Sequence, residues 1–240
     1  MSFRNSVTIV ASPRARVGKT LLARLLVDFH MSEGRSVAAF DLGSGDNTLT
    51  QFLPGHVTTA RIGDIKGQME LFDRLVANDD AAKIVDVGVD AFDSFFTLAA
   101  QIGFAEEARG RSIAPAIMYV MTPDAVSVEA YKNLRERLGP AAFAPVHNEI
   151  LGSAVHRDKY LVTETSTSLV RLPTLAPALR RHVDRPPFSF SDTSLASASD
   201  IPLDVHIELQ RWLRRVYVEF RELDLRILLA DLQSSIQVRP

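Results

Sequence analysis

With 240 residues, 46% of them hydrophobic, the chain is long enough to form a folded domain with a sizeable core. Its 27 basic and 29 acidic side chains leave a net charge of -2, which gives no overall basic field to recruit nucleic acid. The absence of cysteine excludes disulfides, thiolate metal sites and cysteine nucleophiles, and it suits a cytoplasmic location. No segment offers the ~18 uninterrupted apolar residues of a membrane-spanning helix, so we expect a soluble protein.

The first predicted elements are a strand, a loop and a helix. A short β-branched run at 6–11 indicates the strand, and apolar residues at helical spacing over 20–34 indicate the helix, which Gly34 would end. Buried strands follow at 36–42 and 83–88, each with an aspartate near its carboxyl end. In open parallel sheets, acidic residues at such ends lie on the edge where ligands bind.

The remaining pattern alternates strands with helices. Further strands are predicted at 114–122, 142–148 and 168–173, and helices at 62–78, about 91–108, 124–138 and 174–183. This alternation predicts an α/β, doubly wound fold with a mainly parallel sheet, because parallel neighbours need crossover connections.

A long amphipathic helix is predicted at 201–233, after a Pro- and Ser-rich connection at 185–200. Its apolar residues repeat at helical spacing: Val205, Leu209, Trp212, Val216, Phe220, Leu223 and Ile227. We predict that 1–240 forms a single domain, in which 1–188 is a nucleotide-binding core.

The loop sequence "PRARVGKT" (13–20) resembles a phosphate-binding loop, whose pattern is Gly, four free positions and Gly-Lys-Ser/Thr. Pro13 stands at the first glycine position, whereas Gly18, Lys19 and Thr20 match. In such loops backbone amides surround phosphate oxygens, the lysine reaches the β and γ phosphates, and the hydroxyl binds Mg²⁺. The strand–loop–helix setting favours nucleotide binding; the alternative is a helix start that only caps.

The same segment resembles the deviant Walker A motif of the ParA/MinD group of P-loop ATPases, written Lys-Gly-Gly-x-Gly-Lys-Thr. Arg14 stands at the signature lysine and Ala15 and Arg16 at the paired glycines, and residues 17–20 match. The resemblance implies that the loop residues surround the nucleotide phosphates: Ala15, Arg16, Val17, Gly18, Lys19, Thr20 and Leu21.

Three later segments extend this resemblance. The segment 38–53 is similar to the family's switch I, with Asp41 and Asn47 at matching positions. "IVDVG" (84–88) is similar to switch II, with Asp86 at the Walker B position, and "PVHNE" (145–149) resembles the strand whose asparagine, here Asn148, reads the adenine edge. The segment 171–188 looks like the family's closing strand and helix.

The family resemblance implies a switch protein with ATP and Mg²⁺ as cofactors. Thr20 with Asp41 or Asp86 would place the metal, and Asn148 would contact adenine. The ATP-bound form would be a sandwich homodimer that binds a partner or a surface and dissociates from it after hydrolysis. Such proteins act in partitioning or positioning plasmids, chromosomes or protein cargo.

Departures from the family pattern concern catalysis and dimerisation. Arg14 would offer its charge to the γ-phosphate in place of the signature lysine, and side chains at Ala15 and Arg16 fill space that the paired glycines leave for a second subunit. Gly43 replaces the switch I aspartate that positions the attacking water, and Asp46 is a candidate substitute. We therefore expect weak or lost hydrolysis, with Arg14, Lys19 and Asp46 as the catalytic candidates.

Plainer interpretations of these residues stay open. Asp41 and Asp86 could cap the ends of their strands, and Asn148 could satisfy its own loop backbone. The six histidines show no metal-ligand spacing, so Mg²⁺ is the metal that we expect.

The last helix carries arginines beside its apolar face: Arg211, Arg214, Arg215, Arg221 and Arg226. Interspersed acidic residues favour docking on its own domain or on a partner chain, whereas a membrane-surface helix and a local patch for the DNA backbone are the weaker alternatives. The competing function classes are a non-catalytic scaffold that binds a partner through this helix, and a kinase or synthetase acting on a small substrate.

Overall fold

The computed structural model describes residues 5–45, 48–139, 141–152, 169–191 and 201–237. Within them, seven strands form one sheet in the order β3-β2-β4-β1-β5-β6-β7, and every neighbouring pair is parallel. The strands are β1 (Ser6–Ala11), β2 (Val37–Asp41), β3 (Val57–Thr59), β4 (Ala82–Asp86), β5 (Ala114–Val120), β6 (Ala142–Asn148) and β7 (Val170–Leu172). The predicted doubly wound parallel sheet is confirmed.

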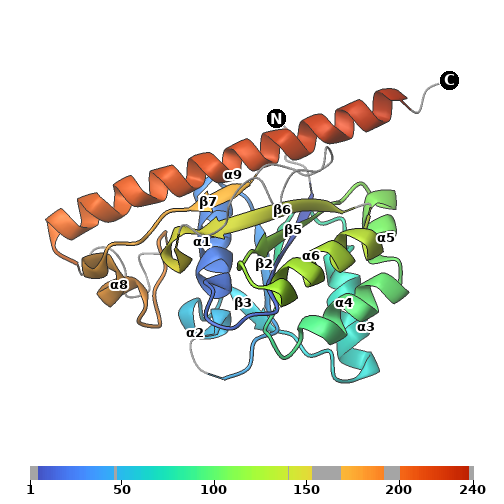
Figure 1. Ribbon diagram of the computed structural model, residues 1–240, viewed down its shortest axis with the longest axis horizontal. Coiled ribbons are helices and arrows are strands. Elements are labelled where there is room, and N and C mark those ends of the chain that lie inside the picture. The colour runs from blue at the N-terminus through green and yellow to red at the C-terminus, as the bar shows by residue number, and fades with distance from the viewer. Residues whose placement is uncertain (1–4, 46–47, 140, 153–168, 192–200, 238–240) are drawn as a thin grey trace.

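Helices cover both faces of the sheet (Figure 1). One face carries α1 (Lys19–Ser32), α2 (Leu49–Phe52), α8 (Pro177–Val183) and α9 (Leu203–Gln237). The other carries α3 (Ile65–Leu75), α4 (Phe92–Gln101), α5 (Phe104–Gly110) and α6 (Ala125–Arg137). A short 3₁₀ helix, η1 (Glu149–Leu151), follows β6.

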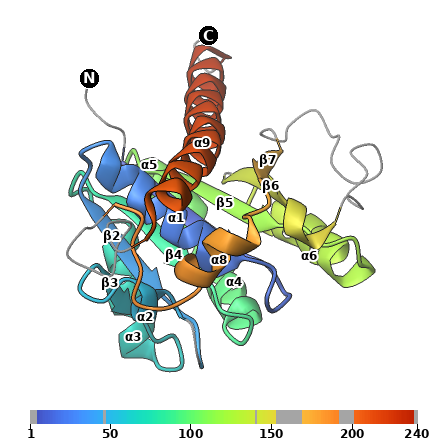
Figure 2. The same cartoon turned by 90° about the vertical axis from the view of Figure 1, so that its left-hand side faces the viewer.

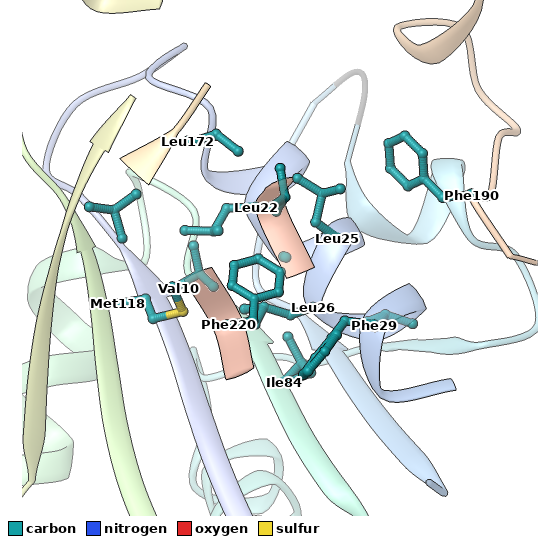
Figure 3. Close-up of a cluster of buried hydrophobic side chains, with 14 of the residues drawn as sticks. Val10, Leu22, Leu25, Leu26, Phe29, Ile84, Met118, Leu172, Phe190 and Phe220 are labelled. Atoms are coloured by element: carbon teal, nitrogen blue, oxygen red, sulfur yellow. The ribbon is translucent and has the colours of Figure 1, made fainter. Parts of the chain in front are cut away.

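The two faces of the sheet bury separate apolar clusters, as the two-residue alternation of a strand requires. In β1, Val10 faces the cluster under α1 and α9, whereas Val7 and Ile9 face the cluster under α4 and α6. Figure 3 shows the first cluster, in which Phe29 of α1 and Phe220 of α9 meet with their ring centroids 5.5 Å apart. Burial on both faces explains why the strands are almost continuously apolar.

Two local differences separate the structure from the sequence-based prediction. The helix predicted at about 91–108 is two helices, α4 and α5, because Gly103 adopts a left-handed φ of 62° between them. The short elements β3 and α2 were not predicted, since three or four residues are too few to show a period.

Helix α9 packs on the sheet and on α1 through one apolar face. Its buried residues are Leu209, Trp212, Leu213, Val216, Phe220 and Leu223, which confirms the predicted apolar stripe. The Trp212 indole donates to the Pro173 carbonyl at 3.0 Å, and the Arg171 amide of β7 donates to Glu219 at 2.9 Å. The C-terminal end of α9 extends beyond the other elements (Figure 2), and the helix exposes Leu225, Leu228, Leu229 and Leu232.

The segment 188–191 runs between α1 and α9 and is bound by two charged residues of α1. Asp28 accepts hydrogen bonds from the Ser189 hydroxyl at 2.7 Å, the Phe190 amide at 2.9 Å and the Ser191 hydroxyl at 2.5 Å. Because Asp28 is fully buried, these three donors replace the water that the carboxylate gives up.

Arg24, one turn before Asp28, is buried among aromatic rings. Its guanidinium carbon lies 3.8 Å from the ring centroid of Phe52, 5.1 Å from that of Phe190 and 5.6 Å from that of Phe188. Its Nη2 donates to the Phe188 carbonyl at 3.2 Å. Burial lowers the pKa of Arg24 to about 9, against the charges of Asp28 and Asp184, and the guanidinium therefore stays protonated at neutral pH.

Within the described residues, no helix combines the length and the apolar character needed to cross a membrane.

Candidate functional site

The candidate site lies where the carboxyl ends of β1, β2 and β4 meet. Parallel pairing places Val10 of β1 beside Asp86, and Asp41 of β2 on the other side of the same residue. The loop that follows β1 crosses this edge and leads into α1. Sequence segments separated by more than 60 residues therefore supply one compact group of side chains, as the sequence predicts.

The phosphate-loop candidate turns sharply into α1. Arg16 and Gly18 both adopt positive φ, 58° and 96°, and α1 begins directly after Gly18 without a side-chain cap. The first amides of a helix have no acceptor within the helix, so this end presents donors and the positive end of the helix dipole. An anion is the ligand that such an end favours.

Lys19 is folded into this loop. Its ammonium donates to the Arg14 carbonyl at 2.6 Å, and the residue is only 8% exposed. Burial lowers the pKa of Lys19, whereas the charge of Asp86 raises it. The lysine thus places a partly desolvated positive charge inside the loop.

A short hydrogen bond joins the start of α1 to the end of β4. The Thr20 hydroxyl donates to Oδ2 of Asp86 at 2.7 Å, and Oδ1 of the same buried carboxyl group has no hydrogen-bond partner among the described residues. Burial raises the pKa of Asp86 to about 6; the Thr20 bond and the Lys19 charge oppose this shift, and the Asp41 charge adds to it. Buried carboxylate oxygens rarely lack a hydrogen-bond partner, so this atom is a candidate ligand for a bound ion.

Asp41 holds the predicted switch I segment. Its two carboxylate oxygens accept hydrogen bonds from the Gly43 and Thr50 amides, both at 2.7 Å. A side chain at Gly43 would place its Cβ 2.9 Å from Oδ1 of Asp41, and one at Gly88 would come 2.7 Å from the Leu42 carbonyl. At Gly88 the obstacle is the backbone after β2, so the two chain segments approach closely enough to require glycine there, whereas at Gly43 the obstacle is the Asp41 side chain.

Mg²⁺ fits the Thr20 and Asp86 part of the site. It takes hard oxygen ligands and usually keeps several waters and substrate phosphates, so one hydroxyl and one carboxylate are a sufficient protein contribution. In the described part of the chain, no three His, Asp or Glu side chains gather into a metal-binding cluster. Both oxygens of Asp41 are already engaged by amides, so Asp41 contributes its negative charge beside Asp86.

A cavity of about 780 Å³ opens beside the loop. Its lining combines Gly18, Lys19 and Thr20 with Asn148, the last residue of β6, and with Pro173 and Leu175 after β7. Arg16, Arg24 and Arg180 also line it, against a single acidic residue, Asp184. The volume is in the range of small-molecule sites, and the excess of positive charge suits an anionic ligand.

Arg14 is directed to a neighbouring helix. Its Nε donates to Asp124 at 3.1 Å and its Nη2 donates to the same oxygen, and Asp124 also accepts from the Ser127 amide as the N-cap of α6. The bonds from Arg14 and then from Thr122 hold the pKa of Asp124 well below its usual range. Ala15 and Arg16, by contrast, are exposed at the tip of the loop.

Asn148 bonds to two backbone groups, one in the phosphate-loop candidate and one in η1. Its Nδ2 donates to the Val17 carbonyl at 2.9 Å, and its Oδ1 accepts from the Ile150 amide at 3.2 Å. The bond from the Ile150 amide is the local loop interaction that the sequence analysis gives as the alternative role of Asn148. Asp46 and Asn47, also predicted from the switch I resemblance, lie outside the described residues.

Sequence reasoning missed three contributors to this region: Asp124 as the partner of Arg14, Arg24 in the cavity lining, and Phe52 beneath Arg24. The only available signal was the pattern of an aspartate before a helical run, which predicts the N-cap at Asp124 but not its ion pair.

Replacing Asp86 by asparagine will make stability depend less on pH. Because burial raises the pKa from 3.8 to about 6, the folded state holds the proton more tightly than the unfolded chain, and this stabilisation is lost as pH rises through about 6. Asp86→Asn should therefore be more stable than the unmodified protein by about 2–3 kcal/mol at pH 7.5, with the difference vanishing near pH 4.

Urea unfolding in EDTA at both pH values measures this difference. Asp73→Asn, an exposed aspartate of α3, is the control and should show no such trend. A stability difference for Asp86→Asn that is the same at pH 4 and pH 7.5 would contradict the burial argument.

Comparisons with known proteins support the fold. No family model matches the chain, and no curated protein matches it. Among solved structures it is similar to the MinC:MinD cell division protein complex of Aquifex aeolicus, at 14% identity and a TM-score of 0.52, over 88% of this chain and 95% of that one. MinD alone from the same organism matches at 15% identity and 0.49, over 88% and 96%. At such identities a likeness shows the fold alone, and the first of these matches shows that this chain has a fold similar to that of MinD.

Proposed function

We propose that this protein is an ATP-binding switch of the ParA/MinD type that uses Mg²⁺ and hydrolyses ATP slowly or not at all. The observation that carries the proposal is that Lys19 and Thr20 line one cavity and that Thr20 bonds to the buried Asp86. A lysine in a tight loop, a hydroxyl at a helix start and an unsatisfied carboxylate form the donor set that a nucleoside triphosphate with its metal requires.

In this proposal the loop amides from Ala15 to Leu21 surround the phosphates, and Lys19 leaves the Arg14 carbonyl to meet the β and γ oxygens. Thr20 and Asp86 hold the metal, directly or through water, and Asp41 adds negative charge. Bound Mg²⁺ would neutralise charge on the β and γ phosphates. The ion would also satisfy the second oxygen of Asp86 and lower the pKa of that carboxyl group.

Slow hydrolysis follows from the switch I segment. Gly43 has no side chain, so this position supplies no carboxylate to align the attacking water. Asp46 is the remaining candidate for that role. Since phosphoryl transfer depends on positioning and electrostatics, the loss of an aligned water lowers turnover by orders of magnitude.

The proposed biological role is the positioning of DNA or protein cargo in the cytoplasm. The similar Aquifex structure contains MinD with MinC, a protein partner. For this chain, a homodimer would bring the exposed Ala15 and Arg16 of two copies together, and these side chains, above all Arg16, would fill space between the loops. Binding of a protein, DNA or a membrane surface would then follow the state of the nucleotide.

A second candidate function is a scaffold that keeps the fold and binds a partner protein through α9. The exposed leucines on the second half of α9 favour it, because four of them lie within eight residues: Leu225, Leu228, Leu229 and Leu232. A switch would bind its partner in only one nucleotide state, whereas a scaffold would bind its partner equally well with and without nucleotide.

Lys19→Ala will weaken ATP binding roughly 10- to 100-fold, because it removes charge-assisted hydrogen bonds to the phosphates. Isothermal titration of the full chain with Mg-ATP measures the loss. Lys66→Ala is the control, since Lys66 is an exposed lysine of α3 whose side chain is 86% accessible. Equal affinities in Lys19→Ala and the unmodified protein would refute the switch and leave the scaffold.

Turnover of saturating Mg-ATP will be on the order of 10⁻³ s⁻¹ or slower, a rate typical of an unassisted P-loop site. Phosphate release from the purified full chain measures it, with Lys19→Ala as the background for contaminating enzymes. A rate near one per second would contradict the inference from Gly43.

Asp124→Ser will raise the preference for ATP over ADP about three- to tenfold if Arg14 serves the γ-phosphate. Serine keeps the N-cap of α6 but removes the carboxylate that now binds Arg14, so the guanidinium becomes available to the ligand. Titrations with both nucleotides give the ratio. Asp64→Ser, at the N-cap of α3, is the matched control. An unchanged ratio would assign Arg14 to the ion pair alone.

A further inference from the structure

Asn148 connects the end of β6 to the phosphate-loop candidate. The residue is 4% exposed, and both polar atoms of its side chain have backbone partners. The Ile150 bond is local and closes the turn into η1, whereas the Val17 bond crosses 131 residues of sequence. The second bond is therefore the one that can act on the loop.

The Val17 carbonyl belongs to the peptide unit that leads into Gly18. A trans peptide is planar, so its carbonyl oxygen and its N–H point in opposite directions. When Asn148 holds the Val17 oxygen, it also fixes the direction of the Gly18 N–H. That amide directly precedes Lys19, and backbone amides at this point of a phosphate loop are donors to the ligand.

Contact with Gly18 itself also limits the loop. Gly18 has φ 96°, and a Cβ on it would come 2.5 Å from Nδ2 of Asn148. The amide of Asn148 therefore leaves no room for a side chain at the bend, which explains why glycine follows the residue to which Asn148 bonds.

We propose that Asn148 is a positioning residue, which keeps the loop in its phosphate-binding shape and contributes to affinity regardless of the base. This inference rests on the proposed nucleotide site. An asparagine amide has two N–H donors and an oxygen with two lone pairs, and here one Nδ2 hydrogen and Oδ1 are bonded to the backbone. The Nδ2 bond acts on the loop whichever base is present.

The test variant is Asn148→Ser. A serine hydroxyl can still accept from the amide two residues on and so preserve the local turn, but it is too short to reach the Val17 carbonyl. The matched control is Asn5→Ser, because Asn5 is a second buried asparagine, which precedes β1 at the opposite end of the sheet and bonds to Asn78. Thermal unfolding of both variants shows that they are folded at the temperature of the titrations.

The probe is inorganic tripolyphosphate with Mg²⁺, which has neither base nor ribose, titrated beside Mg-ATP and Mg-GTP. We expect Asn148→Ser to weaken all three by the same factor, about tenfold, and to leave the ratio of ATP to GTP affinity unchanged. Asn5→Ser should change none of them. Unaltered tripolyphosphate binding together with a selective loss of ATP affinity would overturn the inference and make Asn148 a base reader.

Failure of the underlying function is recognised separately. If the unmodified protein binds neither tripolyphosphate nor either nucleotide, the proposed site itself is wrong. If the unmodified protein binds ATP and Asn148→Ser binds it equally well, the site stands and the positioning role of Asn148 falls.

Discussion

The hydrogen bond from Thr20 to Asp86 connects the phosphate-loop candidate to the acidic end of β4. Burial of Asp86 increases the contribution of this bond to stability. The bond joins the first turn of α1 to the end of β4, at an edge where the parallel sheet also brings Asp41. In water such a bond would contribute little, but a carboxyl group that is 3% exposed has few other partners. Its second oxygen has no hydrogen-bond partner, which destabilises the folded state, and a bound cation would remove this desolvation penalty.

Helix α1 is the element through which this edge is tied to the rest of the chain. Its first turn carries Lys19 and Thr20, and the following turns carry Arg24, Asp28 and Phe29. These last three residues bind the segment 188–191 and the long helix α9. A single rigid helix therefore faces a phosphate-loop candidate at one end and the docking surface of α9 along its side. A shift of α1 would move both the phosphate-loop candidate and the surface on which α9 docks, because close-packed interiors transmit displacement.

The sequence predicts what local chemistry determines. The β-branched runs, the helical spacing and the Gly-Lys-Thr tripeptide are each readable within ten residues, and they place Lys19, Asp41 and Asp86 on one edge correctly. The pairing of Arg14 with Asp124 spans 110 residues, and that of Asn148 with Val17 spans 131. Such pairs depend on strand order, which no local period encodes.

Glu219 of α9 has a consequence for solubility. By accepting the outward amide of Arg171, it occupies a backbone donor of β7, the last strand on that side of the sheet among the described residues. Unpaired amides on a border strand can recruit a strand from another molecule and so begin aggregation. The long helix therefore shields this border from intermolecular β-pairing, and at the opposite border β3 is only three residues long, which offers little length for such pairing.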